Sequence, residues 1–217
     1  LLQAETSAWY TYFTNSIIPD YETNSKQIIY KNLDGYAETK GISINMDAVY
    51  ANNLKIMVGA TIQDVNKTED KTKTRQMLTE RFSGTWAISY TINKLNTTID
   101  YSGNMYGPMR LPVLNALDPR LATSKTYSIQ NIQFTYNGFK NFQIYGGVKN
   151  ILNWTPSKNN PFLIARSHDP FDKKVEFDAG GNPLVTTENP YGLTFDPSYI
   201  YASNQGARTF FGIRYNF

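Results

Sequence analysis

Hydrophobic and polar residues alternate one for one along several stretches of this chain, and helical spacing is almost absent. In residues 81–92 the even positions carry aromatic or aliphatic side chains and one glycine, whereas the odd positions carry mainly small or hydroxylated ones. The same alternation recurs in residues 54–63, 129–136 and 211–217. Because successive side chains of a β-strand point to opposite faces, this pattern predicts strands with one apolar and one polar face.

The pattern predicts eight strands, separated by connections of two kinds. The strands are expected at residues 2–17, 36–50, 54–64, 80–92, 95–104, 127–137, 141–153 and 206–217. Three connections are short and rich in turn-forming residues, namely 51–53, 93–94 and 137–140. The other four are long, namely 18–35, 65–79, 105–126 and 154–205. Short and long connections therefore alternate strictly along the chain.

Two architectures produce such alternation. A soluble sandwich or barrel turns its apolar face inward, whereas a transmembrane barrel turns its apolar face to lipid and its polar face to the lumen. The lengths of the connections distinguish the two architectures, because outer-membrane barrels have short turns at the periplasmic end and long loops outside. The predicted strands also match the ~9–11 tilted residues that cross a bilayer. We therefore predict an all-β fold, an antiparallel transmembrane β-barrel.

Aromatic residues support the membrane interpretation. Several lie near predicted strand ends, where the aromatic girdles of membrane proteins are found: Tyr10, Tyr36, Tyr50, Tyr90, Tyr101, Tyr136 and Trp154. Because lipid offers no hydrogen bonds to a sheet edge, these strands must close into a barrel, alone or with neighbouring strands.

Composition excludes several classes of function. The 217 residues contain no cysteine, which excludes a disulfide scaffold, thiolate zinc sites and cysteine nucleophiles. The single histidine, His168, permits a Ser-His-Asp enzyme but no multi-histidine metal site. With Asp169 and Asp172 it provides too few ligands to predict a metal, and we expect no cofactor. A net charge of +3 is too weak to predict nucleic-acid binding.

The first six residues contain no initiator methionine and no targeting signal, and they already have a strand-like pattern. We therefore expect residues 1–217 to be the C-terminal piece of a larger protein.

Two segments near the C-terminus carry a family resemblance. Residues 206–217 end in phenylalanine after alternate apolar residues, and they resemble the barrel-assembly signal of outer-membrane proteins through Phe211, Ile213, Tyr215 and Phe217. Residues 144–153, IYGGVKNILN, resemble the penultimate strand of TonB-dependent receptors. Residues 32–42 resemble another strand of these receptors, with Ser43 in place of the usual glutamate. The loop segments 107–112, 168–172 and 193–197 resemble receptors of Bacteroides-type Gram-negative bacteria.

The resemblance implies a barrel of 22 strands, of which these are the last eight, with a plug domain and the earlier strands upstream. It implies TonB-dependent uptake across the bacterial outer membrane of a scarce nutrient, such as a ferric siderophore, haem, cobalamin or a copper complex. The implied partners are the plug, the TonB-ExbB-ExbD complex acting through it, outer-membrane lipid and lipopolysaccharide, and a surface lipoprotein. Such receptors are not enzymes.

Candidate ligand-binding residues lie in the predicted extracellular loops: Met105, Tyr106, Met109, Arg110, Arg166, His168, Asp169, Tyr199 and Tyr201. Methionine sulfur suits soft copper or an apolar ring, and aromatic and charged side chains suit a chelate. Ordinary loop packing accounts for the same residues. The basic run 67–75 suits an anionic chelate or lipopolysaccharide, or else a solvated loop tip.

Two other functions compete with uptake. The main alternative is a self-contained eight-stranded barrel with a structural or adhesion role. Side chains fill the lumen of such a barrel, whereas several residues on the polar face here are small, which favours a wide, plugged barrel: Gly59, Ser83, Ala87 and Gly147. The third is an outer-membrane enzyme that uses His168 with a nearby serine or aspartate.

Overall fold

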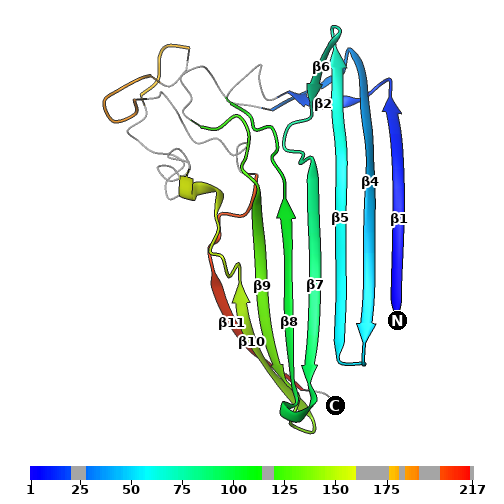
Figure 1. Cartoon of the computed structure of the whole chain (residues 1–217). Coiled ribbons are helices and arrows are strands. Elements are labelled where there is room, and N and C mark those ends of the chain that lie inside the picture. Colours follow the sequence, from blue (N-terminus) through cyan, green and yellow to red (C-terminus); the bar gives the residue numbers. More distant parts are fainter. Residues whose placement is uncertain (21–27, 114–119, 160–175, 181–183, 191–200, 216–217) are drawn as a thin grey trace.

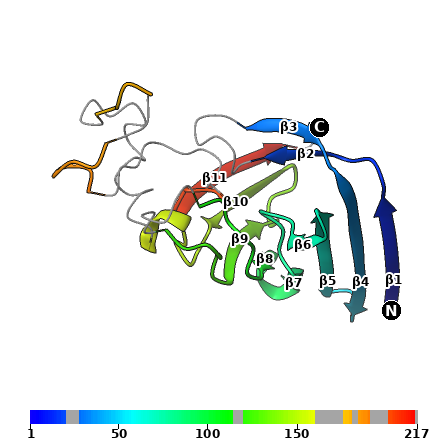
Figure 2. The same cartoon turned by 90° about the horizontal axis from the view of Figure 1, so that it is seen from above.

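Eight long strands form one antiparallel sheet in the computed structural model, which describes residues 1–20, 28–113, 120–159, 176–180, 184–190 and 201–215. Each long strand pairs with the next one along the chain, so the sheet is a meander (Figure 1). The strands are β1 (Leu2–Phe13), β4 (Gly35–Tyr50), β5 (Leu54–Glu69), β7 (Phe82–Ile92), β8 (Thr97–Tyr106), β9 (Tyr127–Tyr136), β10 (Phe142–Lys149) and β11 (Arg208–Tyr215). Seen from above, the sheet is curved (Figure 2).

The short connections lie together at one end of the sheet, which we call the turn end, and the long ones lie at the opposite, loop end (Figure 1). Ala51 and Asn52 make the β4–β5 turn with φ of +48° and +57°. The 3₁₀ helix η1 (Asn93–Leu95) joins β7 to β8 and is followed by Asn96, also left-handed, at φ +49°. Asparagine tolerates this conformation better than most residues. The predicted alternation of short and long connections is confirmed.

The pairing register places most apolar residues of β4 to β11 on one face, as predicted. From β4 to β11, one row of directly paired residues consists of Tyr50, Leu54, Tyr90, Ile99, Phe134, Gly146 and Phe211. The adjacent row, on the opposite face, consists of Val49, Lys55, Ser89, Asp100, Gln133, Gly147 and Phe210. The apolar face is uncovered, with Ile62 70% and Phe211 72% exposed. An apolar surface of this extent is typical of contact with lipid or a partner.

The predicted loops 18–35 and 65–79 were wrong in detail, because both contain strands. β5 continues to Glu69, turns at Asp70 and Lys71, and pairs with β6 (Thr72–Arg75). The first strand ends at Phe13, and β2 (Ile17–Asp20) and β3 (Ile29–Asn32) form a separate hairpin. Polar side chains lie on both faces of the β5–β6 extension, so hydropathy does not alternate there.

Two smaller predictions also need correction. Met105 and Tyr106 end strand β8, because their partners in β7 are Gly84 and Ser83, and they do not lie in a loop. Tyr101 lies in the middle of β8 and contacts Trp86 at a ring-centroid distance of 6.2 Å, so it is not part of an aromatic girdle.

β1 and β11 are the two edges of the sheet, and no pairing joins them within the residues that the structure describes. The strands therefore do not close on themselves here. Both edges present backbone N–H and C=O groups that would be costly to leave unpaired in lipid. Among the described residues, no helix is long and apolar enough to cross a membrane.

Candidate ligand-binding site at the loop end of the sheet

The described core is small and lies at the loop end, on the polar face of the sheet. Met109, Leu111 and Tyr127 are buried together, with exposed fractions of 4%, 2% and 7%. Tyr127 pairs with Tyr106, which pairs with Ser83, so both tyrosines belong to the polar face. The segment after β8 therefore folds back over this face and covers its upper end.

Three aromatic side chains pack against this core, and together with Tyr127 we call them the aromatic cluster: Tyr106, Tyr127, Trp154 and Tyr201. Tyr127 stacks on Tyr106 at a centroid distance of 5.1 Å and on Trp154 at 4.1 Å, and it meets Tyr201 edge-on at 5.9 Å. Such ring geometries each contribute about 0.5–1.5 kcal/mol beyond the area they bury. The cluster joins residues that lie up to 95 positions apart (201 − 106).

A cavity of about 350 Å³ opens beside the cluster. Its lining includes Tyr106, Tyr127, Tyr201 and Met109, with polar groups from Glu80, Asn104 and Ser203. Glu80 is the only charged residue among the described ones that line it. Burial raises the pKa of the Tyr201 phenol, and like any tyrosine below its pKa this residue has a protonated hydroxyl that can donate a hydrogen bond. The cavity therefore offers aromatic surface, a few hydrogen-bonding groups and one negative charge.

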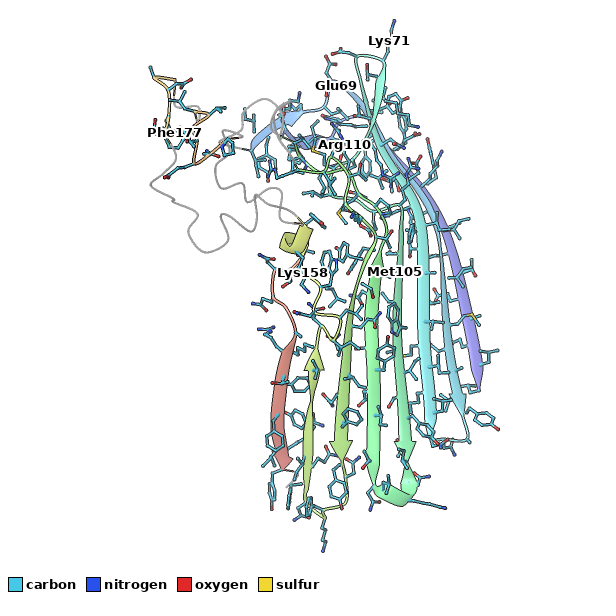
Figure 3. All side chains as sticks on the ribbon, turned by 60° about the vertical axis from the view of Figure 1, so that its left-hand side comes forward. Glu69, Lys71, Met105, Arg110, Lys158 and Phe177 are labelled. Atoms are coloured by element: carbon cyan, nitrogen blue, oxygen red, sulfur yellow. The ribbon has the colours of Figure 1, made fainter. Side chains whose placement is uncertain are left out.

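The structure brings together only some of the predicted ligand-binding residues. Tyr106, Met109 and Tyr201 line the cavity. Met105 lies on the opposite, apolar face beside Gly84, and it is 37% exposed. Arg110 lines a separate small pocket with Lys67 and Arg75, and Figure 3 shows Arg110 above Met105, among the segments of the loop end. Arg166, His168, Asp169 and Tyr199 lie outside the described residues, as does Phe217.

The remaining residues of the predicted assembly signal have the expected alternation. Phe211, Ile213 and Tyr215 pair with Gly146, Ile144 and Phe142 of β10 and belong to the apolar face. Their side chains are 72%, 62% and 55% exposed.

Sequence reasoning missed Tyr127 and Glu80 as parts of this site, and it missed Asn150, whose side chain hydrogen-bonds the backbone of Trp154 in the aromatic cluster. Tyr127 is the first residue of a strand, and an aromatic residue at such a position is common and does not by itself indicate a binding site. Asn150 belongs to the quoted receptor-like segment 144–153, and this motif was the available signal for it.

Ion pairs lie within the β5–β6 hairpin, where Lys67 is 3.6 Å from Glu69, and connect it to β3 and β4. Lys31 lies 3.2 Å from Glu69 and 3.4 Å from Asp20, and Arg75 lies 3.2 Å from Asp64. Lys73 pairs with Glu38. Hydrogen bonds to Glu69 and Asp20 raise the pKa of Lys31. Lys71 is at the tip of the hairpin (Figure 3). Most of the predicted basic run is thus engaged within the protein.

Among the described residues, no group of three histidine, cysteine, aspartate or glutamate side chains could hold a metal ion.

The fold of this chain is similar to the folds of solved outer-membrane receptors. No protein-family model matches the sequence, and no curated protein matches it. The pyoverdine receptor FpvA of Pseudomonas aeruginosa aligns with 100% of this chain and 27% of its own, at 14% identity and a TM-score of 0.61. The ferric-catecholate import receptor Fiu of E. coli K12 aligns with 70% of this chain and 21% of its own, at 15% identity and a TM-score of 0.55.

The copper transporter OprC aligns with 70% of this chain and 23% of its own, at 13% identity and a TM-score of 0.54. All three proteins are TonB-dependent receptors. The chain has the barrel fold of TonB-dependent receptors. It spans about a quarter of the length of these receptors, and at such identities the likeness concerns the fold of the receptor barrel alone.

We expect Tyr127→Leu to destabilise the loop end of this receptor-type barrel. Leucine keeps the site apolar but removes three ring contacts, so the expected loss is about 2–3 kcal/mol. Urea unfolding in detergent, followed by near-ultraviolet circular dichroism, measures it. Tyr145→Leu is the matched control, because Tyr145 has a single, tilted ring contact at 6.4 Å. An equal loss in both variants would show that the stacking adds nothing.

Proposed function

We propose that this chain is the C-terminal part of a 22-stranded receptor barrel in the outer membrane of a Gram-negative bacterium, and that the barrel imports a scarce nutrient with energy delivered by TonB. The shared fold carries this proposal. The open edges at β1 and β11 support it, because further strands would pair with both.

The cavity beside the aromatic cluster is the proposed contact site for the nutrient. It lies at the loop end of the polar face, where a ligand arriving from outside would first meet the lumen. Tyr106, Met109 and Tyr201 are the proposed ligand contacts within it. Of the other candidates, Arg110, Arg166, His168, Asp169 and Tyr199 remain proposed contacts, whereas Met105 is dropped because it belongs to the apolar face. A plug domain would lie lower, against the polar face. The nutrient class is a metal chelate or related complex: a ferric siderophore, haem, cobalamin or a copper complex.

Radiolabel uptake tests this function. Cells that produce the intact protein are starved of metal and then supplied separately with ⁵⁵Fe-loaded siderophores, haem, ⁵⁷Co-cobalamin and ⁶⁴Cu. We expect uptake of one of them to need both this protein and a working TonB. Uptake that is the same without TonB, or the same without this protein for every compound, would contradict the proposal.

The intact mass of the purified membrane protein tests the alternative, a self-contained eight-stranded barrel. We expect a mass several tens of kDa above the 24.7 kDa of this chain. A mass near 24.7 kDa, with no second fragment in the preparation, would favour the structural or adhesion role instead.

A further inference from the structure

The segment between β10 and β11 leaves the sheet and returns to it at one place, and Asn150 occupies that place. Asn150 follows directly after β10, is only 5% exposed, and has a left-handed backbone with φ of +52°. Its side-chain amide donates hydrogen bonds to the carbonyl oxygens of Trp154, at 2.6 Å, and Gln205, at 3.0 Å. Its side-chain oxygen accepts a bond from the Trp154 N–H at 3.1 Å. One side chain thus joins the outgoing chain to the returning chain.

Asn153 makes a second connection between the same two segments. Its side-chain oxygen accepts a hydrogen bond from the backbone N–H of Ala207 at 2.9 Å. A Cβ atom at Gly206 would lie only 2.4 Å from this oxygen, so the returning chain fits closely here because residue 206 has no side chain. Asn153 is also left-handed, with φ of +49°. Together, Asn150 and Asn153 bind residues 205–207, some 55 positions away along the chain.

The hydrogen bonds of Asn150 and Asn153 lie next to two members of the aromatic cluster, Trp154 and Tyr201. The backbone of Trp154 donates one hydrogen bond to the Asn150 side chain and accepts another from it. The Trp154 ring stacks on that of Tyr127 at a centroid distance of 4.1 Å, with an interplanar angle of 8°. Tyr201 stands four residues before Gln205 on the returning chain and contacts both Tyr127 and Trp154.

We propose that Asn150 is a positioning residue, which closes the base of the segment between β10 and β11 and thereby presents Trp154 and Tyr201 to Tyr127. Asparagine is suited to this role for two reasons. It tolerates a left-handed backbone, and its amide supplies both the donor and the acceptor that the two chain segments need. Aspartate keeps the acceptor and tolerates the backbone but loses the donor.

Asn150→Asp tests the proposal in the intact membrane protein, with Trp9, Trp86 and any tryptophan outside residues 1–217 changed to phenylalanine so that Trp154 is the sole tryptophan. The substitution leaves two buried carbonyl oxygens without their donor, so we expect the opened arrangement of Trp154 to become on the order of tenfold more populated. Acrylamide quenching of Trp154 fluorescence measures this opening. The thermal unfolding of the barrel, measured separately, should change little, because no strand pairing is lost.

Asn96→Asp is the matched control. Asn96 is another left-handed asparagine, but it directly follows η1 at the turn end of the sheet, whereas Trp154 belongs to the aromatic cluster at the loop end. We expect no change in Trp154 quenching in this variant. Asn153→Gly is the second test variant, because glycine keeps the left-handed backbone and removes the acceptor for Ala207; it should raise quenching as well.

Unchanged quenching in both Asn150→Asp and Asn153→Gly would overturn the proposal. So would an equal rise in Asn96→Asp, or a rise that occurs only when the barrel itself unfolds. If Asn150→Asp does not assemble, Asn153→Gly alone decides between these outcomes. None of these results depends on nutrient uptake, so the positioning role and the proposed transport can fail independently.

Discussion

Replacing Ile88 with lysine is expected to prevent the folded protein from accumulating in the outer membrane. Ile88 lies in the middle of β7 on the apolar face, directly paired with Ile56 of β5 and Tyr101 of β8. In a membrane barrel this face contacts the hydrocarbon of the bilayer. A lysine near the bilayer midplane of such a barrel costs about 2–4 kcal/mol, a large part of the net stability of an ordinary domain.

Ser89→Lys is the matched control, one residue along the same strand and on the opposite face. Ser89 pairs with Lys55 and Asp100, so a lysine there meets one ammonium group and one carboxylate, whose effects oppose each other. We expect this variant to assemble in nearly normal amounts. Heat-modifiable migration of membrane fractions on gels and urea unfolding in lipid vesicles measure both variants. Equal tolerance of lysine at the two positions would contradict the assignment of the faces.

Adding a methyl group at Gly147 is expected to be far more damaging than adding one at Gly146. A Cβ atom at Gly147 would lie 2.1 Å from the carbonyl oxygen of Ile132 and 2.9 Å from the Cα of Gln133, so strands β9 and β10 would have to move apart. At Gly146 the nearest atom would be the carbonyl oxygen of Phe210, at 3.1 Å. We expect a loss on the order of 3 kcal/mol for Gly147→Ala and about 1 kcal/mol for Gly146→Ala.

The free energy of unfolding of the two variants, measured in urea with lipid vesicles, gives the comparison directly. The two sites are neighbours on one strand and receive the same methyl group, so differences in helix or strand propensity cancel. Similar losses at both positions would mean that β9 and β10 are not as close at Gly147 as the structure places them.

The sequence predicts the long strands of this fold well because one face of the sheet is apolar and the other is polar. In residues 81–92 each even side chain belongs to the apolar face and each odd one to the polar face, so alternation reveals both strand and orientation. Towards the loop end of the sheet, the two faces no longer differ in polarity. Residues 66–69 continue β5 with polar side chains on both faces, so the pattern could not show that the strand goes on.

The candidate site was harder to predict because it is made by contacts between distant residues. Tyr106 and Tyr201 were recognised as single loop candidates, but only the folded chain shows that they meet around Tyr127. Met105 and Met109 look equivalent in the sequence. One belongs to the apolar face of β8 and the other is buried beneath the aromatic cluster, since strand β8 ends between them.

The meander order of the sheet has a consequence for a chain that has been cut by a protease. Each pair of consecutive long strands is hydrogen-bonded together, so a single cut in a long connection separates no paired strands. The two fragments would stay joined by the full ladder between the strands on either side of the cut. A cleaved protein should therefore keep its barrel and release its fragments only when it is boiled in detergent.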